Sequence, residues 1–418
     1  MPYKPTRPTR VLMLVENNPY PFDGRVRSEA ESLASAGYRV TVVCPRESGQ
    51  PHYEVIADVR VYRFVAVAEG HGLVGYAREY LYATLWLLVY YVYLLLRHGF
   101  DIVHVYNPPD TVGIIGLLTK LLGKKFVYDH RDPSPDLYAS KFDSDSGLIY
   151  ATLIWLEHLC CRHAHLVIAP NEYCRDLEIT RHHVPAHNIA VVYNGPKLDR
   201  FVPRPPAPIV RNRAPNIIAF LGHISSQDGV DHLLRALYHL RFDLGREDFF
   251  CIIVGPSDDE DALRRQLDAL DLAGYVWLTG KIPFGETLLA YLSAADICVE
   301  PAPSSPLNNI ATFVKVMEYM ALGKPIVAYD LPGNRFLADA SALYARVNDP
   351  ADFADKLAGL MDAPTMRQAM GCQGQRRVRD RFAWEKSAET LLHAYQRLTV
   401  DGPLDRPART IRSVHEVE

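Results

Sequence analysis

A short segment near residue 312 combines groups suited to bind an anionic ligand that also carries hydroxyls. Thr312, Phe313 and Val314 stand where a helix is expected to begin, and free N–H groups at a helix start favour a diphosphate-sized anion. Lys315 is a candidate cation beside that anion. Glu318 follows three residues later on the same flank of the helix, where its carboxylate suits the hydroxyls of a ribose.

The surrounding spacing predicts a helix that begins just after residue 309 or 312 and ends at Gly323. Asn309 or Thr312 is suited to cap its start, and Gly323 with the following proline is suited to end it. Its apolar residues recur at helical spacing and are expected to face a core: Phe313, Val316, Met317 and Met320. Two plainer interpretations remain open. In the first, the segment is an ordinary amphipathic helix that binds no ligand. In the second, Lys315 forms an ion pair with Glu318 and does not bind an anion.

Short apolar segments alternate with helical segments along the chain, which is typical of parallel sheets covered on both faces. Prolines between residues 203 and 215 indicate a linker. We therefore predict an α/β fold with two doubly wound, Rossmann-like domains, 1–203 and 204–385, and a ligand cleft between them. A last helix, 386–400, is expected to pack back onto the first domain, and 402–418 to form a loose tail.

The composition is that of a soluble globular protein of 418 residues, with 48% hydrophobic and 22% charged residues. A formal charge of −4 gives no reason to expect a nucleic-acid partner. The seven cysteines form no C-x-x-C pair, which argues against structural zinc and for a reducing, cytoplasmic location.

One apolar segment, residues 80–96, raises the question of a membrane. Its 17 residues include five tyrosines and Trp86, side chains that favour the membrane–water interface. A spanning helix needs about 20 residues. Three interpretations stay open: a core helix of the first domain, a helix that contacts the inner face of the cell membrane, and a transmembrane span.

Several motifs, taken in chain order, carry a family resemblance: Asp23-Gly24-Arg25-Val26-Arg27-Ser28-Glu29-Ala30, Asn107-Pro108-Pro109-Asp110, Tyr128-Asp129-His130, Asn194-Gly195-Pro196, Glu318-Tyr319-Met320-Ala321-Leu322-Gly323-Lys324-Pro325 and Phe382-Ala383-Trp384-Glu385. Together they resemble the retaining nucleotide-sugar glycosyltransferases of the GT-B fold, in particular family four. The Glu318 motif is the most specific. The resemblance implies that the first domain binds the acceptor and the second binds the nucleotide sugar.

The resemblance also implies roles for residues of the second domain. Glu318 would bind the donor ribose, and Lys315 would assist beside it. The loop that follows Thr279 would contact the base through its backbone. Members carry a further glutamate where this chain has Ile310, so an asparagine is expected to hold the sugar hydroxyls. The full donor set comprises Gly222, His223, Gly255, Gly280, Lys281, Ile282, Asn308, Asn309, Thr312, Phe313 and Val314.

This chain departs from the family at the diphosphate. Members commonly carry an arginine just after Gly222 and a lysine before the next helix, but here those positions hold His223 and Asp228. A hydrogen bond to a charged group contributes about 1.5–3 kcal/mol, so the loss of both cations is expected to weaken binding. The helix start, Lys315, Arg25 or a protonated His223 would then neutralise the diphosphate.

His130 stands where the family's active-site histidine stands, and it is expected to hydrogen-bond the transferred sugar. A structural histidine at a strand end is the alternative. Polar residues after strands of the first domain are expected at the acceptor, with capping of nearby helices as the alternative: Asn17, Asn18, Asp23, Arg25, Asn107, Asp110 and Asp132.

The resemblance thus implies a hexosyltransferase-type enzyme that moves a sugar from a nucleoside diphosphate, UDP being favoured, to a glycan or lipid-linked acceptor with retention. No metal or other cofactor is expected. Asp143-Ser144-Asp145 has the D-x-D pattern of a metal site but lies in a polar loop. Two alternatives are a catalytically weak partner protein that binds a nucleotide sugar, and a sugar phosphorylase of the same fold.

Overall fold

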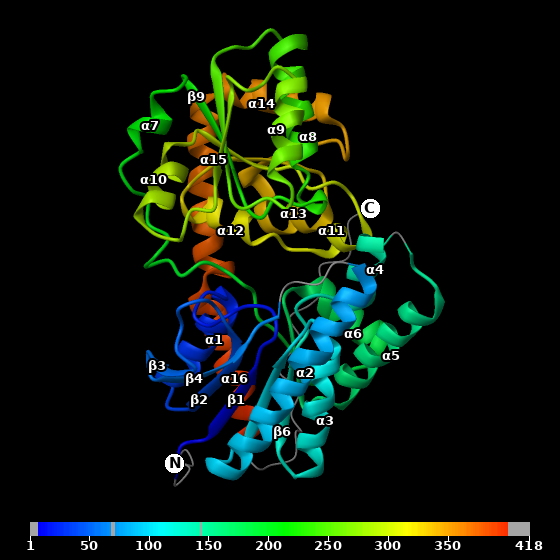
Figure 1. The fold of residues 1–418 in the computed structure, drawn as a ribbon. Coiled ribbons are helices and arrows are strands. Elements are labelled where there is room, and N and C mark those ends of the chain that lie inside the picture. The colour runs from blue at the N-terminus through cyan, green and yellow to red at the C-terminus, as the bar shows by residue number, and fades with distance from the viewer. Residues whose placement is uncertain (1–6, 68–71, 143, 400–418) are drawn as a thin grey trace, which may run out of the picture.

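The computed structural model describes residues 7–67, 72–142 and 144–399, which form two α/β domains stacked end to end (Figure 1). Among the described residues, the first sheet has the strand order β3-β4-β2-β1-β5-β6-β7-β8 and the second the order β11-β10-β9-β12-β13-β14. Every strand pair is parallel except β3 with β4. The predicted fold of two Rossmann-like domains is confirmed. The predicted tail, 402–418, and Asp143 lie outside the described residues.

The first sheet consists of β1 (Arg10–Leu14), β2 (Arg39–Arg46), β3 (Tyr53–Ile56), β4 (Val59–Val65), β5 (Ile102–Tyr106), β6 (Lys125–Asp129), β7 (Leu166–Ala169) and β8 (Ile189–Val191). Its helices are α1 (Gly24–Ser35), α2 (Gly72–Arg97), α3 (Gly113–Leu121), α4 (Ser134–Phe142), α5 (Gly147–His163) and α6 (Glu172–His182), joined by α16 (Trp384–Thr399). Side chains of β1 alternate between two cores. Val11 and Met13 pack with α1 and α16, whereas Leu12 and Leu14 pack with α2, α3 and α5.

The second sheet consists of β9 (Asn216–Leu221), β10 (Phe249–Val254), β11 (Val276–Gly280), β12 (Ile297–Glu300), β13 (Ile326–Tyr329) and β14 (Ala342–Ala345). Its helices are α7 (Pro208–Arg211), α8 (Val230–Tyr238), α9 (Glu260–Ala269), α10 (Glu286–Ala294), α11 (Pro306–Ile310), α12 (Val314–Ala321), α13 (Pro332–Ala338), α14 (Pro350–Met361) and α15 (Pro364–Arg377). Helices cover both faces, so the strands are almost wholly apolar.

The helix predicted to end at Gly323 is present as α12, but its start differs from the prediction. The structure has two helices, α11 and α12, separated by an extended turn, and neither Asn309 nor Thr312 caps α12. Two contacts favour the break. Asn171 of the first domain donates to Ile310 O and Thr312 Oγ1, both at 3.1 Å, and the Gly333 backbone approaches Ala311 O so closely that a Cβ would lie 1.9 Å away.

Strand β3 and helix α4 were not predicted. β3 forms a hairpin with β4 through Ala57 and Asp58, which both adopt positive φ, as a tight two-residue turn requires. The pair Ala-Asp lacks the glycine that usually announces such a turn, so the sequence gives no clear signal for it.

The C-terminal helix α16 lies against α1, far from its neighbours in the sequence (Figure 1). Trp384 Nε1 donates to Ser32 Oγ at 3.0 Å, and the Tyr395 hydroxyl lies 2.7 Å from His104 Nδ1. The chain therefore crosses between the domains twice, once through the linker after β8 and once before α16.

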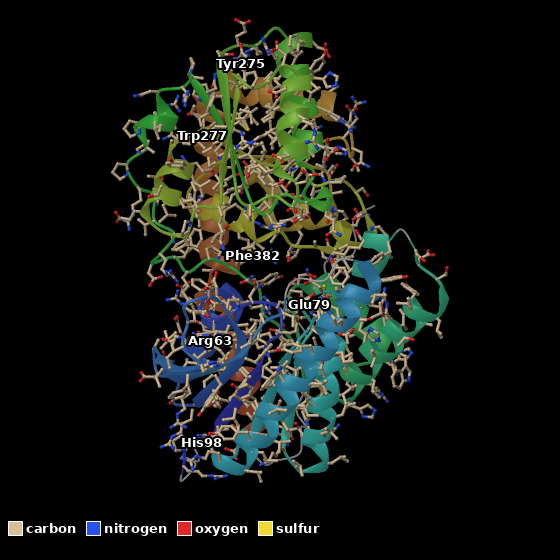
Figure 2. The ribbon with its side chains drawn as sticks, viewed as in Figure 1. Arg63, Glu79, His98, Tyr275, Trp277 and Phe382 are labelled. Carbon is tan, nitrogen blue, oxygen red and sulfur yellow. The ribbon has the colours of Figure 1, made fainter. Side chains whose placement is uncertain are left out.

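These two crossings touch each other at Gly195, close to Phe382, which Figure 2 shows between the domains. A Cβ on Gly195 would lie 1.6 Å from Phe382 O, so we expect Gly195→Ala to lower the free energy of unfolding by about 1–3 kcal/mol through overpacking. Differential scanning calorimetry measures the effect. Gly274→Ala is the control, because a Cβ there meets no atom within 4 Å. Equal melting temperatures for the two variants would contradict the prediction.

Helix α2 has one buried face and one exposed face, and both are apolar. Ala83, Leu87, Tyr91 and Leu94 are buried against the first sheet, while the opposite side is apolar and exposed. By length and composition alone, the 24 residues of Val74–Arg97 are long and apolar enough to cross a membrane. Because its inner face packs on the sheet, α2 lies along the domain surface.

Candidate active site

A cleft with a volume of about 1110 Å³ separates the two domains. The second domain contributes Val314 and Glu318 from α12, together with the loop from Lys281 to Phe284. The first domain contributes Glu16, Asn17 and Asn18, which follow β1, and residues of α2. The linker contributes Asn194 to Lys197, Arg200 and Phe201. A ligand in this cleft therefore contacts both domains at once.

Glu318 faces the cleft with a half-buried carboxylate, to which none of the described residues donates a hydrogen bond. Burial raises the pKa of Glu318 to about 7, although the nearby Lys315 acts in the opposite direction. A carboxylate in this environment is costly to ionise unless a ligand donates hydrogen bonds to it. Glu318 is thus placed and poised to bind hydroxyl groups.

Lys315 pairs with two other carboxylates instead of Glu318. Its Nζ lies 3.0 Å from Asp228 Oδ1 and 3.2 Å from Glu300 Oε2, and the lysine is 8% exposed. Burial opposes the charge of Lys315, but Glu300 and Asp228 together raise its pKa. The ammonium also lies against the loop after β9, since a Cβ on Gly222 would be 3.2 Å from Nζ.

Three predicted glycines meet at the carboxyl edge of the second sheet. Gly222 N donates to Val254 O at 3.0 Å, and Gly255 N donates to Gly280 O at 3.1 Å. A Cβ on Gly255 would lie 1.8 Å from Gly222 O, so only glycine permits this approach. The structure therefore brings Gly222, Gly255, Gly280 and Lys315 together, next to the Lys281 and Ile282 wall of the cleft.

The start of α12 is placed differently from the prediction. Phe313 precedes the helix and makes no side-chain cap, and Val314 reaches the cleft. Thr312 is engaged by Asn171. Asn308 is buried and donates to Gln227 O at 3.0 Å and Pro303 O at 2.8 Å. Contrary to the prediction, its side chain does not face the cleft.

Two other expected donor groups are engaged elsewhere. The Asn309 side-chain oxygen Oδ1 accepts from Ser304 Oγ at 3.1 Å. His223 is exposed and lies 2.6 Å from Asp258 Oδ1, outside the cleft wall. Neither side chain is oriented toward the cleft in this structure.

His130 does not face the cleft, contrary to the expectation that it contacts the transferred sugar. Its ring is fully buried, with Nε2 2.7 Å from Glu157 Oε1 and Nδ1 3.2 Å from Glu178 Oε1. Burial opposes its charge, but Cys161 and Glu157 raise the pKa of His130 well above its ordinary value. Here His130 joins β6 to α5 and α6.

Most of the expected acceptor residues are also held inside the first domain. Arg25 is buried and makes a bidentate pair with Asp129, at 2.8 and 2.9 Å. Asp23 caps α1 through Val26 N at 3.0 Å and pairs with Arg131 at 2.9 Å. The capping alternative therefore describes Asp23, and neither residue lines the cleft.

Asn107, Asp110 and Asp132 form a second internal group. The Asn107 amide donates to Asp110 Oδ1 at 3.1 Å and to Asp132 O at 2.7 Å, and its oxygen accepts from Arg131 N at 2.6 Å. Asp110 also accepts from the Tyr128 hydroxyl. These residues shape the loops after β5 and β6 but do not line the cleft. Of the acceptor set, only Asn17 and Asn18 do.

Three acidic residues of the cleft, Glu16, Glu47 and Glu79, were missed by the sequence analysis. Glu16 lies two residues after β1, Glu47 directly follows β2, and Glu79 stands beside Arg78 in the first half of α2. Burial, with Glu79 as a second cause, raises the pKa of Glu16 to about 8. A carboxylate just after a buried strand is the signal that points to Glu16 and Glu47, whereas Glu79, next to Arg78, carries no such signal.

An aromatic and cationic group was missed as well. Phe201 and Phe284 have ring centroids 4.9 Å apart, and the Arg200 guanidinium lies 4.7 Å from the Phe284 centroid. All three line the cleft beside Ile282. The two ring planes are inclined by 48°, so one ring at a time offers a stacking surface for a base or a sugar ring.

Glu29, His104 and Asp129 place three metal-ligand atoms within 4.8 Å of one another. The group does not fit a resident metal, because the Arg25 guanidinium already supplies the positive charge there. Burial, followed by Asp129, raises the pKa of Glu29 to about 8, so a second carboxylate charge is disfavoured. This group lies in the core of the first domain, away from the cleft residues.

Two family models match the chain. The Glycosyl transferase 4-like domain matches residues 24–195, and Glycosyl transferases group 1 matches residues 215–363. Among curated relatives, the D-inositol 3-phosphate glycosyltransferase of Saccharomonospora viridis is 28% identical over 188 residues, 43% of this chain and 42% of that protein. The alpha-maltose-1-phosphate synthase of Mycobacterium tuberculosis is 26% identical over 270 residues, 60% of this chain and 67% of that protein.

Solved structures match over both domains. A sucrose-phosphate synthase from Thermosynechococcus elongatus superposes with a TM-score of 0.74 at 21% identity, covering 94% of this chain and 99% of the other. The Anabaena protein HepE in complex with UDP-glucose gives a TM-score of 0.70 at 15% identity, covering 93% and 99%. These likenesses agree with the fold. Together with the two family matches, they show that this chain belongs to the group 1 glycosyltransferases of the GT-B fold.

Proposed function

We propose that this protein transfers a glycosyl group from a nucleoside diphosphate sugar to a hydroxyl group of an acceptor. The bond between the sugar C1 and the β-phosphate oxygen breaks, and C1 bonds to the acceptor oxygen. The acceptor proton leaves with a phosphate oxygen, and the nucleoside diphosphate is released. The observation that carries the proposal is Glu318, a half-buried carboxylate without a described partner, facing a cleft formed by both domains.

Within this proposal, Glu318 accepts hydrogen bonds from the donor ribose, and the Lys281–Ile282 loop contacts the base. Phe201 or Phe284 offers a stacking surface nearby. UDP is the favoured nucleotide, since HepE is a protein of this fold whose solved complexes contain UDP and UDP-glucose. Retention of the anomeric configuration follows the resemblance to family four.

Lys315 is proposed to take over from the two missing cations. Its ammonium already lies against Gly222, at the edge of the sheet where the family's arginine and lysine would act. Asp228 holds the lysine there at 3.0 Å, and Ser225 Oγ fixes Asp228 at 2.7 Å. A bound diphosphate would attract Lys315 Nζ away from Asp228. It would also accept hydrogen bonds from the N–H groups at the start of α12. This arrangement requires no metal.

The acceptor is proposed to bind on the first-domain wall beside Asn17, Asn18, Glu16 and Glu79, whose oxygens suit sugar hydroxyls. A glycan or a lipid-linked acceptor fits this polar wall.

A cytoplasmic location is supported by seven free cysteines, six of them buried.

A panel of UDP, GDP and ADP sugars tests the proposal, with binding measured by calorimetry and turnover by release of the nucleoside diphosphate. We expect binding and slow hydrolysis of one sugar nucleotide class, accelerated by an acceptor. Binding without any turnover would favour a partner protein, the alternative that the neutralised Lys315 supports. Incorporation of labelled phosphate into a sugar phosphate would indicate a phosphorylase.

Donor affinity is expected to depend on pH through Glu318. Its pKa of about 7 means that the carboxylate is mostly protonated at pH 6 and mostly ionised at pH 8. A ribose that donates hydrogen bonds prefers the ionised form, so Kd should fall about tenfold from pH 6 to pH 8. Calorimetric titration of UDP at each pH measures the change.

Two variants test whether the pH dependence comes from Glu318 or from Glu16, which also lines the cleft. Glu318→Gln should remove the pH dependence, whereas Glu16→Gln, which removes the other carboxyl with a raised pKa, should leave it in place. A slope that persists in Glu318→Gln would contradict the assignment.

A further inference from the structure

Three helices on one side of the first domain present apolar side chains to solvent. On α2 the exposed residues Leu81, Leu85, Val89, Val92 and Leu96 recur at helical spacing. They form a stripe opposite the buried one, so the helix is apolar on both its inner and outer sides. A soluble monomer seldom leaves such a stripe uncovered.

The stripe continues onto the neighbouring helices, which lie beside α2 in Figure 1. The Thr119 hydroxyl of α3 donates to Tyr91 of α2 at 3.2 Å, and α3 packs on α5. α3 exposes Leu118 and Leu121, the latter 83% exposed, and α5 exposes Trp155. We call the exposed apolar side chains of α2, α3 and α5 the three-helix face.

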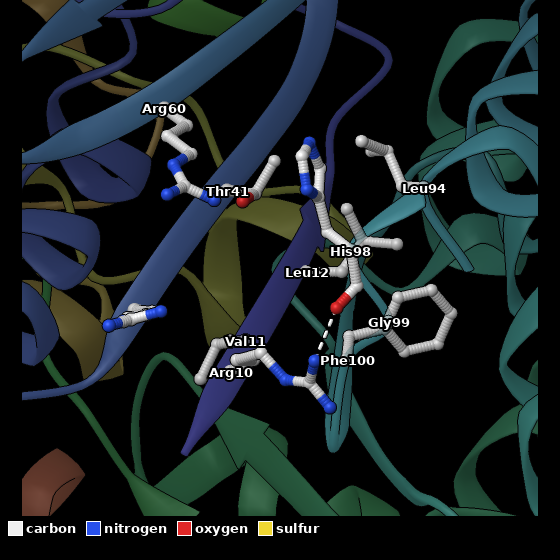
Figure 3. Close-up of a pocket in the computed structure, with 10 residues that line it drawn as sticks. Arg10, Val11, Leu12, Thr41, Arg60, Leu94, His98, Gly99 and Phe100 are labelled. Atoms are coloured by element: carbon white, nitrogen blue, oxygen red, sulfur yellow. Dashed lines mark hydrogen bonds between the residues drawn. The ribbon is translucent and has the colours of Figure 1, made fainter. Parts of the chain in front are cut away.

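Cationic residues gather where these helices end. Arg97 and His98 close α2, Lys120 lies in the last turn of α3, and Arg162 closes α5. Figure 3 shows the end of α2, where Arg10 and Arg60 lie beside His98 around a small cavity of about 20 Å³. The Arg10 guanidinium donates to His98 O and pairs with Asp101, so the positive charge of the border comes from Arg60, Arg97, Lys120 and Arg162. An apolar face with a basic border matches the charge of an anionic lipid surface.

α2 also connects this face to the cleft. Glu79, Tyr82 and Ala83 line the cleft from the N-terminal half of α2, while Leu81 and Leu85 point outward from the same turns. Figure 2 shows Glu79 near the junction of the domains and His98 at the far end of the first domain. One helix therefore touches the substrate cleft and the exposed face.

We propose that the three-helix face docks on an anionic bilayer and that the acceptor is a lipid-linked molecule delivered to the cleft along α2. The docking on a bilayer is independent of the proposed function. The delivery of a lipid-linked acceptor to the cleft rests on that function. α2 would lie in the plane of the interface, because its inner side is buried in the first domain. Its tyrosines and Trp86 suit the headgroup region.

Sedimentation with vesicles of three parts phosphatidylcholine and one part phosphatidylglycerol tests the docking. We expect the wild type to pellet with these vesicles, and Leu85→Glu/Val89→Glu/Leu118→Glu to lower the partition coefficient at least tenfold. Ile209→Glu/Leu244→Glu/Val347→Glu is the matched control, since these three residues are also exposed and apolar but lie on the second domain. Arg97→Glu/Arg162→Glu should weaken binding to anionic vesicles without altering apolar side chains.

Each outcome has a distinct meaning. Failure of the wild type to pellet, or equal loss in the control, would overturn the docking. A dimer in light scattering that the face variant converts to monomer would overturn it in favour of a second copy as the occupant. Melting temperatures and UDP binding verify that the variants are folded.

The acceptor is tested separately with one donor. The face variant should lose at least tenfold in kcat/KM with a vesicle-embedded lipid-linked saccharide, but keep its rate with a soluble saccharide. Equal loss on both acceptors would overturn the delivery role. Vesicle binding without UDP binding would leave the docking intact and refute the proposed function instead.

Discussion

Glu318→Ala is expected to reduce kcat/KM by about 10²–10⁴-fold while leaving the protein at least as stable as the wild type. Two ribose hydroxyls that donate to an ionised carboxylate contribute about 1.5–3 kcal/mol each, and the loss of both corresponds to that range. Stability should not fall, because burial makes the ionised Glu318 unfavourable before the donor binds. A residue with a purely structural role would show the opposite combination.

Steady-state kinetics with the donor identified by the panel, together with calorimetric unfolding, measure both effects. Glu286→Ala is the control, since that carboxylate belongs to the same domain but is 87% exposed and does not line the cleft. Unchanged kcat/KM in Glu318→Ala would contradict the ribose assignment. A large loss of stability would assign the residue to the fold.

Lys315→Met is expected to lower the free energy of unfolding by about 3–5 kcal/mol. The substitution leaves Glu300 fully buried without its cation, and an uncompensated buried charge is strongly destabilising. Burial already raises the pKa of Glu300, with Lys315 opposing that shift, so the orphaned carboxyl would take up a proton. Denaturant unfolding at pH 7 measures the loss.

The double variant Lys315→Met/Glu300→Gln separates stability from binding. Neutralising the orphaned acid should restore most of the stability, since the pair is then replaced by two uncharged groups. Diphosphate binding should remain weak because the cation is still absent. Asp228→Asn gives the complementary test, as a lysine released from Asp228 should bind UDP more tightly than the wild type. A double variant that binds UDP normally would show that Lys315 only supports the fold.

The framework of the fold could be predicted from the sequence because its signals are local. Continuous apolar runs identify buried parallel strands, as in β5 and β10, and the proline-rich linker identifies the domain boundary. Gly222 and Gly280 were predicted from the family resemblance; that they and Gly255 meet where β9, β10 and β11 end agrees with the rule that carboxyl ends of adjacent strands share one edge.

The orientation of individual side chains could not be predicted, because it depends on partners distant in the sequence. His130 follows β6 as expected, but Glu157 and Glu178 hold its ring in the core. Arg25 begins α1 as expected, yet Asp129, more than a hundred residues away, binds its guanidinium. The break before α12 depends on Asn171 of the other domain. None of these pairings can be recognised from the local sequence pattern.

A crystal structure of the protein with bound UDP tests the central claim most directly. We predict that UDP lies in the cleft between the domains, with ribose hydroxyls within hydrogen-bonding distance of the Glu318 carboxylate and the diphosphate beside Lys315 Nζ and the start of α12. UDP bound at another surface, or bound in the cleft with Glu318 unliganded and Lys315 still held by Asp228, would contradict the account.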